Sequence, residues 1–459
     1  MFSSYSQAVD ALYRRINFES LAAGKPGGYS SGDFKLDRMR NLLEALDSPH
    51  EKIPAVHVAG TKGKGTTCTL VASILQEAGY RIGLFTSPHM YRIEERFQVN
   101  GQSPTPLRFT QMVNQLMPFL DKLDGPESQL NATFFEIINA IAWLYFLEEE
   151  VDIVVLETGL GGRLDSTIFC QPLVTAITSI SLDHTKILGE TIGEIAREKA
   201  GILKTGIPLV SGVLDPQAQQ TIHEIAIQRD CPVVQLGRDF DYQTKNNWTQ
   251  NNPVQQVQFD TKPADPEKEL SFTLKQPGSP IAQNASLAVS IIQQLPKQKF
   301  NVSSQNIQRA ICDVVLPLRF EILEHDPVTV VDSAHNQASI EAVIETAHQI
   351  FPGKFLTVIL SVSHDKDYLA ICRKLQGVDL VIVTNYLGNQ RALSIGELKR
   401  AVLAACDANV MTANSPAEAW ILAQQETVTQ GVILATGSLF LAAEVRELVL
   451  QKPGSSSLT

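Results

Sequence analysis

The sequence predicts an α/β protein of two domains: a doubly wound N-terminal domain with a phosphate-binding loop, then a smaller α/β domain. Short apolar runs of strand length alternate with longer helical stretches, which is typical of right-handed βαβ units. The runs are continuously apolar, as in strands buried on both faces of a parallel sheet. A chain of 459 residues is also too long for one ordinary core, because domains usually hold about 100–200 residues.

The first part of the chain supplies five predicted strands, with helical stretches such as Thr67–Ala78 and Phe134–Glu149 between them. The strand-like runs are Ile53–Ala59, Arg81–Thr86, Asp152–Leu156, Leu173–Ile177 and Pro208–Val213.

Further along the chain, the composition of the sequence changes twice. Asp239–Leu274 is polar with short alternating runs, which predicts a few exposed antiparallel strands. The polar, Pro-bearing stretch Leu295–Ser304 is interpreted as the domain boundary, which gives domains of residues 1–297 and 298–459. The second domain resumes the alternation with predicted strands at Val328–Asp332, Phe355–Leu360, Leu380–Thr384 and Val432–Ala435.

Composition excludes several classes of protein. With 38 Lys and Arg against 49 Asp and Glu, the net charge is −11, which argues against a nucleic-acid-binding surface. The N-terminus lacks the apolar core of a signal peptide, and no stretch is apolar for long enough to span a membrane. Six cysteines are scattered singly, a pattern typical of reduced thiols. We therefore expect a cytoplasmic protein.

The strongest local signal is a glycine-rich turn between a predicted strand and a helix, within His57–Thr67 (HVAGTKGKGTT). Gly60, Gly63 and Gly65 allow successive backbone N–H groups to face one anion. Lys64 and the helix N-terminus add positive charge, and a threonine hydroxyl could bind Mg²⁺. The strict pattern GxxxxGK[ST] is not met, and a glycine turn without a ligand is the alternative. Phosphate binding is favoured.

Two further loops follow buried strands. Glu157 ends one strand ahead of a glycine-rich stretch, at the sheet edge where open α/β sheets bind ligands, so it is a natural Mg²⁺ ligand. A solvated acid in a glycine-rich connection is an equally good interpretation. His184 follows the next strand, and taken alone is better explained as a hydrogen-bonded core histidine. Lys199 lies in a helical stretch, where a lone lysine is usually a solvated charge.

Together these motifs resemble the folylpolyglutamate and dihydrofolate synthases, the folate branch of the Mur ligase family. The resemblance covers nearly the whole chain and rests on HVAGTKGKGTT, TSPHM, LETGLGGRLDST, SLDHTKILG, REKAGILKTGIP, LRFEIL and DSAHNQ in this order. It implies an ATP-binding domain, a smaller Rossmann-like domain and an active site in the cleft between them. It also implies ATP, two Mg²⁺ ions, L-glutamate, and folate or dihydropteroate as ligands, and a monomer.

The resemblance assigns roles to individual residues. Lys199 matches a lysine that is carbamylated in the family, and His335 matches a histidine needed for catalysis. Ser87 and Glu157 would lie at one Mg²⁺ ion and His184 at the other. The ATP contacts implied are Gly60, Thr61, Lys62, Gly63, Lys64, Gly65, Thr66, Thr67, Asn284, Arg319 and Asp332. The pterin or folate contacts implied are Asp165 and the run Thr133–Glu136 (TFFE), in which Thr133 and Phe134 are the candidate binding residues.

The chain also departs from the family pattern. Lys62 replaces the usual Asn, Thr66 replaces Ser, and Leu318 replaces the glycine before Arg319. The DGAHNP motif has become DSAHNQ, Ile168 stands where Asn closes the LDATN pattern, and Pro280-Ile281 replaces His-Gln ahead of Asn284. These changes affect the tuning of nucleotide and substrate binding rather than the reaction class.

The reaction implied is carboxylate activation by the γ-phosphate of ATP, followed by attack of the glutamate amine on the acyl phosphate. Lys64, Arg319 and two Mg²⁺ ions would neutralise the two anions that meet. Glutamate must attack as a neutral amine, which requires a base or a lowered amine pKa, and His335 is the candidate helper. Three alternatives stay open: a Mur-type ligase for a UDP-linked wall precursor, a P-loop GTPase switch, and an inactive paralogue. Whether dihydropteroate, reduced folates or both are accepted also stays open.

Overall fold

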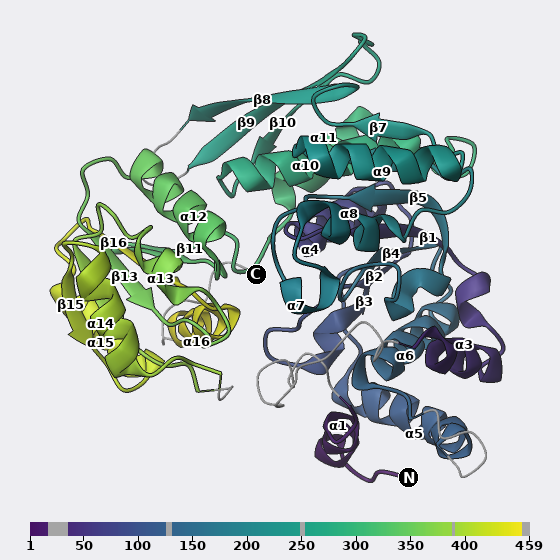
Figure 1. Ribbon diagram of the computed structural model, residues 1–459, viewed down its shortest axis with the longest axis horizontal. Helices are drawn as coiled ribbons and strands as arrows, with labels where there is room; N and C mark the ends of the chain where they lie inside the picture. The colour runs from purple at the N-terminus through teal and green to yellow at the C-terminus, as the bar shows by residue number, and fades with distance from the viewer. Residues whose placement is uncertain (17–34, 125–130, 248–252, 388–390, 452–459) are drawn as a thin grey trace. The chain divides into compact units, whose positions relative to one another are not determined.

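The computed structural model describes residues 1–16, 35–124, 131–247, 253–387 and 391–451 (Figure 1). The contacts between residues divide the chain into two compact units. The first holds residues 1–243, 258–272 and 283–314, and the second holds 244–257, 273–282 and 315–459.

The first unit contains a seven-stranded sheet in the order β3-β2-β4-β1-β5-β6-β7. Every neighbouring pair is parallel except β2 and β3, which are antiparallel. All five predicted strands are confirmed as members of this sheet. The strands are β1 (Pro54–Ala59), β2 (Ile82–Phe85), β3 (Phe97–Val99), β4 (Ile153–Glu157), β5 (Gln171–Ile177), β6 (Leu209–Ser211) and β7 (Val233–Gln235).

Helices pack on this sheet because their apolar residues face it. One cluster joins α1, α3, α5 and α6 to β1, β2 and β4, and a second joins α8 and α9 to β1 and β5. The helices of this part of the chain are α1 (Tyr5–Tyr13), α3 (Leu36–Ala45), α4 (Lys64–Glu77), α5 (Pro106–Leu123), α6 (Phe134–Glu148), α7 (Thr185–Leu188), α8 (Ile192–Ala200), α9 (Pro216–Gln228), α10 (Ser279–Gln294) and α11 (Ser304–Asp313), with 3-10 turns η2 (Pro49–Glu51), η3 (Ile93–Arg96) and η4 (Ser166–Phe169).

A separate three-stranded sheet occupies the polar region that the sequence singled out. Its strands are β8 (Phe240–Asn247), β9 (Val254–Thr261) and β10 (Leu270–Leu274), in the order β10-β9-β8. In β9 the buried residues Gln255, Val257 and Phe259 alternate with more exposed ones, as expected for a strand with one buried face.

The second unit contains a six-stranded sheet in the order β11-β12-β16-β13-β14-β15, parallel except for the β11–β12 pair. Its core lies under α12, α13 and α14. The strands are β11 (Glu321–His325), β12 (Val328–Val331), β13 (Leu356–Leu360), β14 (Leu380–Val383), β15 (Asn409–Thr412) and β16 (Val432–Thr436). The helices are α12 (Gln337–Ile350), α13 (Tyr368–Cys372), α14 (Ile395–Ala405), α15 (Pro416–Glu426) and α16 (Leu439–Leu450).

The division by contacts keeps α11 in the first unit and begins the last segment of the second unit at Val315. The sequence placed a boundary earlier, within Leu295–Ser304, and the functional domains 1–297 and 298–459 stay a prediction.

In the part of the chain that the structure describes, every helix is too short or too polar to span a bilayer.

Candidate functional site

The turn between β1 and α4 has a backbone that only glycine fits. Gly60 has a φ of +150°, and a Cβ atom there would lie 1.9 Å from Oγ1 of Thr178. Gly63 has a φ of +83°, and its Cβ atom would lie 2.3 Å from Oδ1 of Asn284. Thr178 and Asn284 approach the turn so closely that only glycine fits at these two positions. This approach also places Asn284, one of the predicted ATP contacts, directly against the turn.

The loop that follows β5 holds this turn in shape. The Ser179 carbonyl accepts from the Thr61 N–H at 2.8 Å, and the Ser179 hydroxyl accepts from the Lys62 N–H at 3.0 Å. Thr178 donates its hydroxyl to the Lys62 carbonyl at 2.6 Å. Protein contacts thus fix the turn, and α4 begins at Lys64 with its N-terminal N–H groups beside it.

Glu157 lies at the carboxyl end of β4, next to the start of α4. Its Oε1 is 3.8 Å from the Lys64 ammonium nitrogen, and its Oε2 accepts from the Ser87 N–H at 2.9 Å. A Cβ atom on Gly65 would lie 3.3 Å from the same Oε2, so glycine there leaves room for the carboxylate. The structure therefore brings together Ser87, Glu157 and Lys64, which are far apart in the sequence.

The donor set at Glu157 fits Mg²⁺. This ion is usually bound by one or two protein oxygens together with substrate phosphates. Glu157 is only 3% exposed, and its carboxylate meets the N-terminal end of a helix where a phosphate group would bind. Within the described ranges, no group of three or more His, Cys, Asp or Glu side chains is arranged to hold a metal without such a ligand. Thr66 and Thr67, the hydroxyl candidates, are both buried in the first turn of α4.

Lys199 projects from α8 into the protein interior and is only 4% exposed. Its ammonium nitrogen donates to the Gly60 carbonyl at 2.9 Å. Burial, aided by the nearby positive charge of Lys64, lowers the pKa of Lys199 to about 7, while Asp183 opposes that shift. A substantial fraction of this amine is therefore neutral near pH 7, which a solvated lysine would not be.

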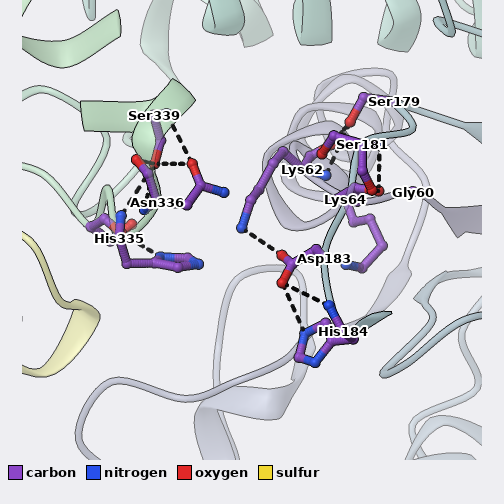
Figure 2. A network of polar contacts seen from close by, with 12 residues as sticks. Gly60, Lys62, Lys64, Ser179, Ser181, Asp183, His184, His335, Asn336 and Ser339 are labelled. Atoms are coloured by element: carbon purple, nitrogen blue, oxygen red, sulfur yellow. Dashed lines mark hydrogen bonds and ion pairs between the residues drawn. The ribbon is translucent and has the colours of Figure 1, made fainter. Parts of the chain in front are cut away.

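His184 lies in the loop that follows β5 and has a left-handed φ of +51°. Its N–H donates to Oδ1 of Asp183 at 3.0 Å, and the ring Nε2 is 3.8 Å from the same oxygen. The other oxygen of Asp183 pairs with the ammonium group of Lys62 at 3.0 Å. Figure 2 shows Asp183 between these two residues.

The predicted acceptor contacts have structural partners of their own. Thr133 caps α6, and its hydroxyl accepts from the Glu136 N–H at 3.3 Å. Phe134 is fully buried, and its ring stacks on Tyr13 at a centroid distance of 5.3 Å. The neighbouring Phe135, which belongs to the same predicted run, is more exposed.

Asp165 is part of a buried hydrogen-bond chain. Its Oδ1 accepts from the backbone N–H and the hydroxyl of Thr167 at 3.0 and 2.6 Å, and its Oδ2 accepts from the Leu160 N–H at 2.8 Å. Burial raises the pKa of Asp165 above its usual value. Thr167 in turn contacts Nε2 of His57 at 2.9 Å. His57 was not predicted to be part of the site, because a single histidine in an apolar strand carries no recognisable signal.

In the second unit, Arg319 lies between two residues in the left-handed region. Leu318 has a φ of +57° and Phe320 a φ of +43°. Asp332 accepts from the Phe320 N–H and the Ala334 N–H, both at 2.8 Å, and burial raises its pKa. Arg319 also contacts the Ser333 hydroxyl. These hydrogen bonds to Asp332 thus hold the backbone next to Arg319 in place.

His335 lies just beyond β12, near the start of α12. Its Nδ1 is 2.9 Å from the Ser333 carbonyl. Because a carbonyl only accepts, Nδ1 carries the hydrogen, and in the neutral ring Nε2 is left as the basic nitrogen. Ser339 and Asn336 accompany it in a network at the start of the helix (Figure 2).

Two family models match the chain, and together they span most of it. Residues 58–292 match the Mur ligase middle domain, and residues 318–439 match the Mur ligase glutamate ligase domain. The first match holds the turn after β1, Glu157, His184 and Lys199, and the second holds Arg319, Asp332 and His335.

Individual proteins are similar over almost their full length. The dihydrofolate synthase/folylpolyglutamate synthase of Bacillus subtilis is 35% identical over 97% of this chain and 99% of its own. The folylpolyglutamate synthase of Lacticaseibacillus casei is 30% identical over 92% of this chain and 95% of its own. A structure of the folylpolyglutamate synthase of Mycobacterium tuberculosis, complexed with ADP and AMPPCP, superposes with a TM-score of 0.84 at 27% identity, covering 98% of this chain and 99% of that one.

Proposed function

The chain belongs to the Mur ligase family, on the branch of the folylpolyglutamate and dihydrofolate synthases, and we propose that it joins L-glutamate to a folate or dihydropteroate carboxylate with consumption of ATP. One observation carries the proposal furthest. Gly60 and Gly63 let Thr178 and Asn284 pack closely against the turn after β1, and Lys64 and Glu157 lie together at the start of α4. A switch GTPase would have no use for a glutamate ligase domain.

The chemistry starts from a carboxylate, which is a poor electrophile. A carboxylate oxygen of the acceptor attacks the γ-phosphorus of ATP, the bond to the β–γ bridging oxygen breaks, and ADP leaves. The amine of L-glutamate then attacks the acyl carbon, phosphate leaves, and the amide remains. The first step brings two anions together, so it depends on preorganised positive charge.

We assign that charge to Lys64 in the first unit and Arg319 in the second. Lys64 stands at the N-terminus of α4, so its ammonium group and the helix dipole act on the same phosphates. Gly60–Thr67, Asn284 and Asp332 complete the nucleotide contacts. The position of Asp332 behind Phe320 supports a role in holding Arg319 for the nucleotide.

His335 is our candidate for the base that receives the proton from the attacking amine. Glutamate must react as a neutral amine, so a proton acceptor is needed. The hydrogen bond from Nδ1 to the Ser333 carbonyl supports this assignment, because it leaves Nε2 to accept the proton.

Two Mg²⁺ ions are part of the proposal, one held by Ser87 and Glu157 and the other by His184. Bound there, Mg²⁺ would neutralise charge on the nucleotide phosphates. We also propose that Lys199 is carbamylated. A neutral amine attacks CO₂, a proton is released and a carboxylate forms, and the lowered pKa of Lys199 supplies the neutral amine near pH 7.

The acceptor is proposed to bind near Thr133, Phe134 and Asp165. Because Phe134 is buried in the structure, its neighbour Phe135 is the aromatic side chain of this run that has exposed surface to offer a ring system. We propose both activities, on dihydropteroate and on reduced folates, in a monomeric cytoplasmic enzyme with glutamate-ligase chemistry in residues 298–459.

The test is ADP release by the purified chain with ATP, Mg²⁺ and L-glutamate. It is run separately with dihydropteroate and with tetrahydrofolate, and the product is identified by mass. We expect one glutamate to be added to each acceptor. Addition to one acceptor alone would restrict the enzyme to one activity. No ADP release and no adduct with either acceptor would overturn the assignment, in favour of another carboxylate such as a UDP-linked wall precursor or of an inactive nucleotide site.

A further inference from the structure

The side chain of Lys62 has a charged partner that neither the turn nor the reaction requires. Its main chain is fixed by Ser179 and Thr178, whereas its ammonium group extends to Oδ2 of Asp183 at 3.0 Å. The Lys62 side chain is 34% exposed and that of Asp183 is 17% exposed. The ammonium group is therefore the part of Lys62 that is able to change partners while the turn keeps its shape.

Asp183 has a second attachment that keeps it in place. Its Oδ1 accepts from the His184 N–H at 3.0 Å, so its two oxygens are divided between Lys62 and the left-handed residue that follows it (Figure 2). If Lys62 moves away, Asp183 remains attached to its own loop. The carboxylate is therefore held in position whether or not the Lys62 ammonium group is bound to it.

The charges around the turn favour an exchange. Lys62 and Lys64 carry its positive charge, while Asp183 and Glu157 supply the neighbouring negative charge. A nucleotide polyphosphate carries several negative charges and would enter beside Lys62. Its oxygens would compete with Asp183, which offers a single charge already shared with a backbone N–H.

We propose that Lys62 exchanges Asp183 for a phosphate oxygen when the nucleotide binds, so that Asp183 competes with the nucleotide and sets its affinity. The proposal rests on the proposed function only in taking ATP as the nucleotide. Breaking the Lys62–Asp183 pair then subtracts from the free energy of binding. Because binding is weaker, the nucleotide is released more easily after the reaction.

Asp183→Asn removes the carboxylate that competes with the nucleotide and frees the Lys62 ammonium group. AMPPCP should bind about two- to fivefold tighter, which is the range that one partly exposed ion pair supports. Lys62→Asn, which places the usual residue of the family in the turn, should weaken AMPPCP binding about tenfold.

The experiment is a double-mutant cycle measured by calorimetric titration with AMPPCP at one fixed, saturating Mg²⁺ concentration. Asp183→Asn should tighten binding in the unsubstituted chain and in Lys62→Arg, and have no effect in the Lys62→Asn background. Glu341→Gln breaks a comparable ion pair to Lys374 on the second unit and serves as the matched control, with no change expected. Thermal melting of each variant checks that it is folded.

Two results would count against different parts of the account. If Asp183→Asn weakens AMPPCP binding, or changes it by the same factor in the unsubstituted chain and in the Lys62→Asn background, then Asp183 only supports the loop and the exchange does not occur. If the unsubstituted chain fails to bind AMPPCP at all, the proposed function itself is wrong.

Discussion

Each unit has backbone with positive φ next to a cation that we propose binds the nucleotide, and the two units achieve this conformation in different ways. Before Lys64 the chain uses Gly60 and Gly63, at positions where a Cβ atom would collide with a neighbouring side chain. Around Arg319 the chain turns through left-handed backbone with a leucine and a phenylalanine instead, at φ values of +57° and +43°.

The second arrangement has its own supports. Left-handed backbone costs a residue with a side chain about 1–2 kcal/mol. Glu321 accepts from the Leu318 N–H at 2.9 Å and Asp332 accepts from the Phe320 N–H at 2.8 Å, and both apolar side chains are buried. Glycine is therefore needed only where a Cβ atom has no room, as at Gly60 and Gly63. Where there is room, buried carboxylates and packing can hold other residues in the same conformation.

The largest expected effect is at the glycine turn. Gly60→Ala should lower kcat/KM about 100-fold or more, because a Cβ atom 1.9 Å from the Thr178 hydroxyl must displace the turn and misplace the bound phosphates. Gly79→Ala is the matched control, since Gly79 has a φ of +93° but nothing within 4 Å of the added atom. It should cost only stability. Equal kinetics for the two variants would remove the steric argument.

Asp332→Asn tests the carboxylate support in the second unit. Asn keeps one acceptor where two backbone N–H groups need one each, so the free energy of unfolding should fall by about 1–3 kcal/mol. The KM for ATP should also rise about tenfold if Arg319 is held this way. Asp379→Asn is the control, because Asp379 accepts from the Leu356 N–H without contacting the Arg319 segment. A KM unchanged in both variants would separate Asp332 from the nucleotide.

The buried His57 next to the glycine turn should make stability depend on pH. Burial lowers the pKa of His57 to about 3, whereas the unfolded chain takes up the proton near pH 6.5. The unfolded state therefore binds more protons between these values, and stability falls as pH falls through that window. In His57→Gln this contribution should vanish, reducing the mean slope between pH 6.5 and 5 by about 1.1 kcal/mol per pH unit. Urea unfolding at pH 6.5 and 5 measures it, and identical slopes would contradict the buried neutral ring.

The smallest effect isolates the left-handed backbone at Leu318. Leu318→Ala and Leu318→Gly both lose a buried side chain, but only glycine is free of the left-handed penalty. The glycine variant should therefore be more stable than the alanine variant by about 1 kcal/mol, the reverse of the usual order. Denaturant unfolding of the two variants decides it, and alanine being the more stable would mean that Leu318 is not strained.

Much of the fold could be predicted from the sequence because its central strands are apolar on both faces. Four strands were missed: β3, β7, β11 and β15. Each of these lies at an edge of its sheet. An edge strand has one neighbour, so it needs no continuous apolar run, and β15 is in fact half exposed or exposed along its length.

The site divides in the same way. The glycine turn and Glu157 could be found because their residues are contiguous or end a recognisable strand. The contact between Lys199 and the Gly60 carbonyl joins residues 139 positions apart, and nothing local marks it. The left-handed conformation of Leu318 was not predicted either, since leucine ordinarily argues against it. Its one signal is that the family has a glycine at this position.

The most direct test of the proposed chemistry follows an oxygen atom. A folate acceptor labelled with ¹⁸O in its terminal carboxylate is incubated with the purified chain, ATP, Mg²⁺ and L-glutamate, and the released phosphate is analysed by mass. Activation of the acceptor by the γ-phosphate predicts one ¹⁸O atom in each phosphate, because the acyl phosphate breaks between the acyl carbon and that oxygen. Glutamate addition with unlabelled phosphate would contradict activation of the acceptor by the γ-phosphate.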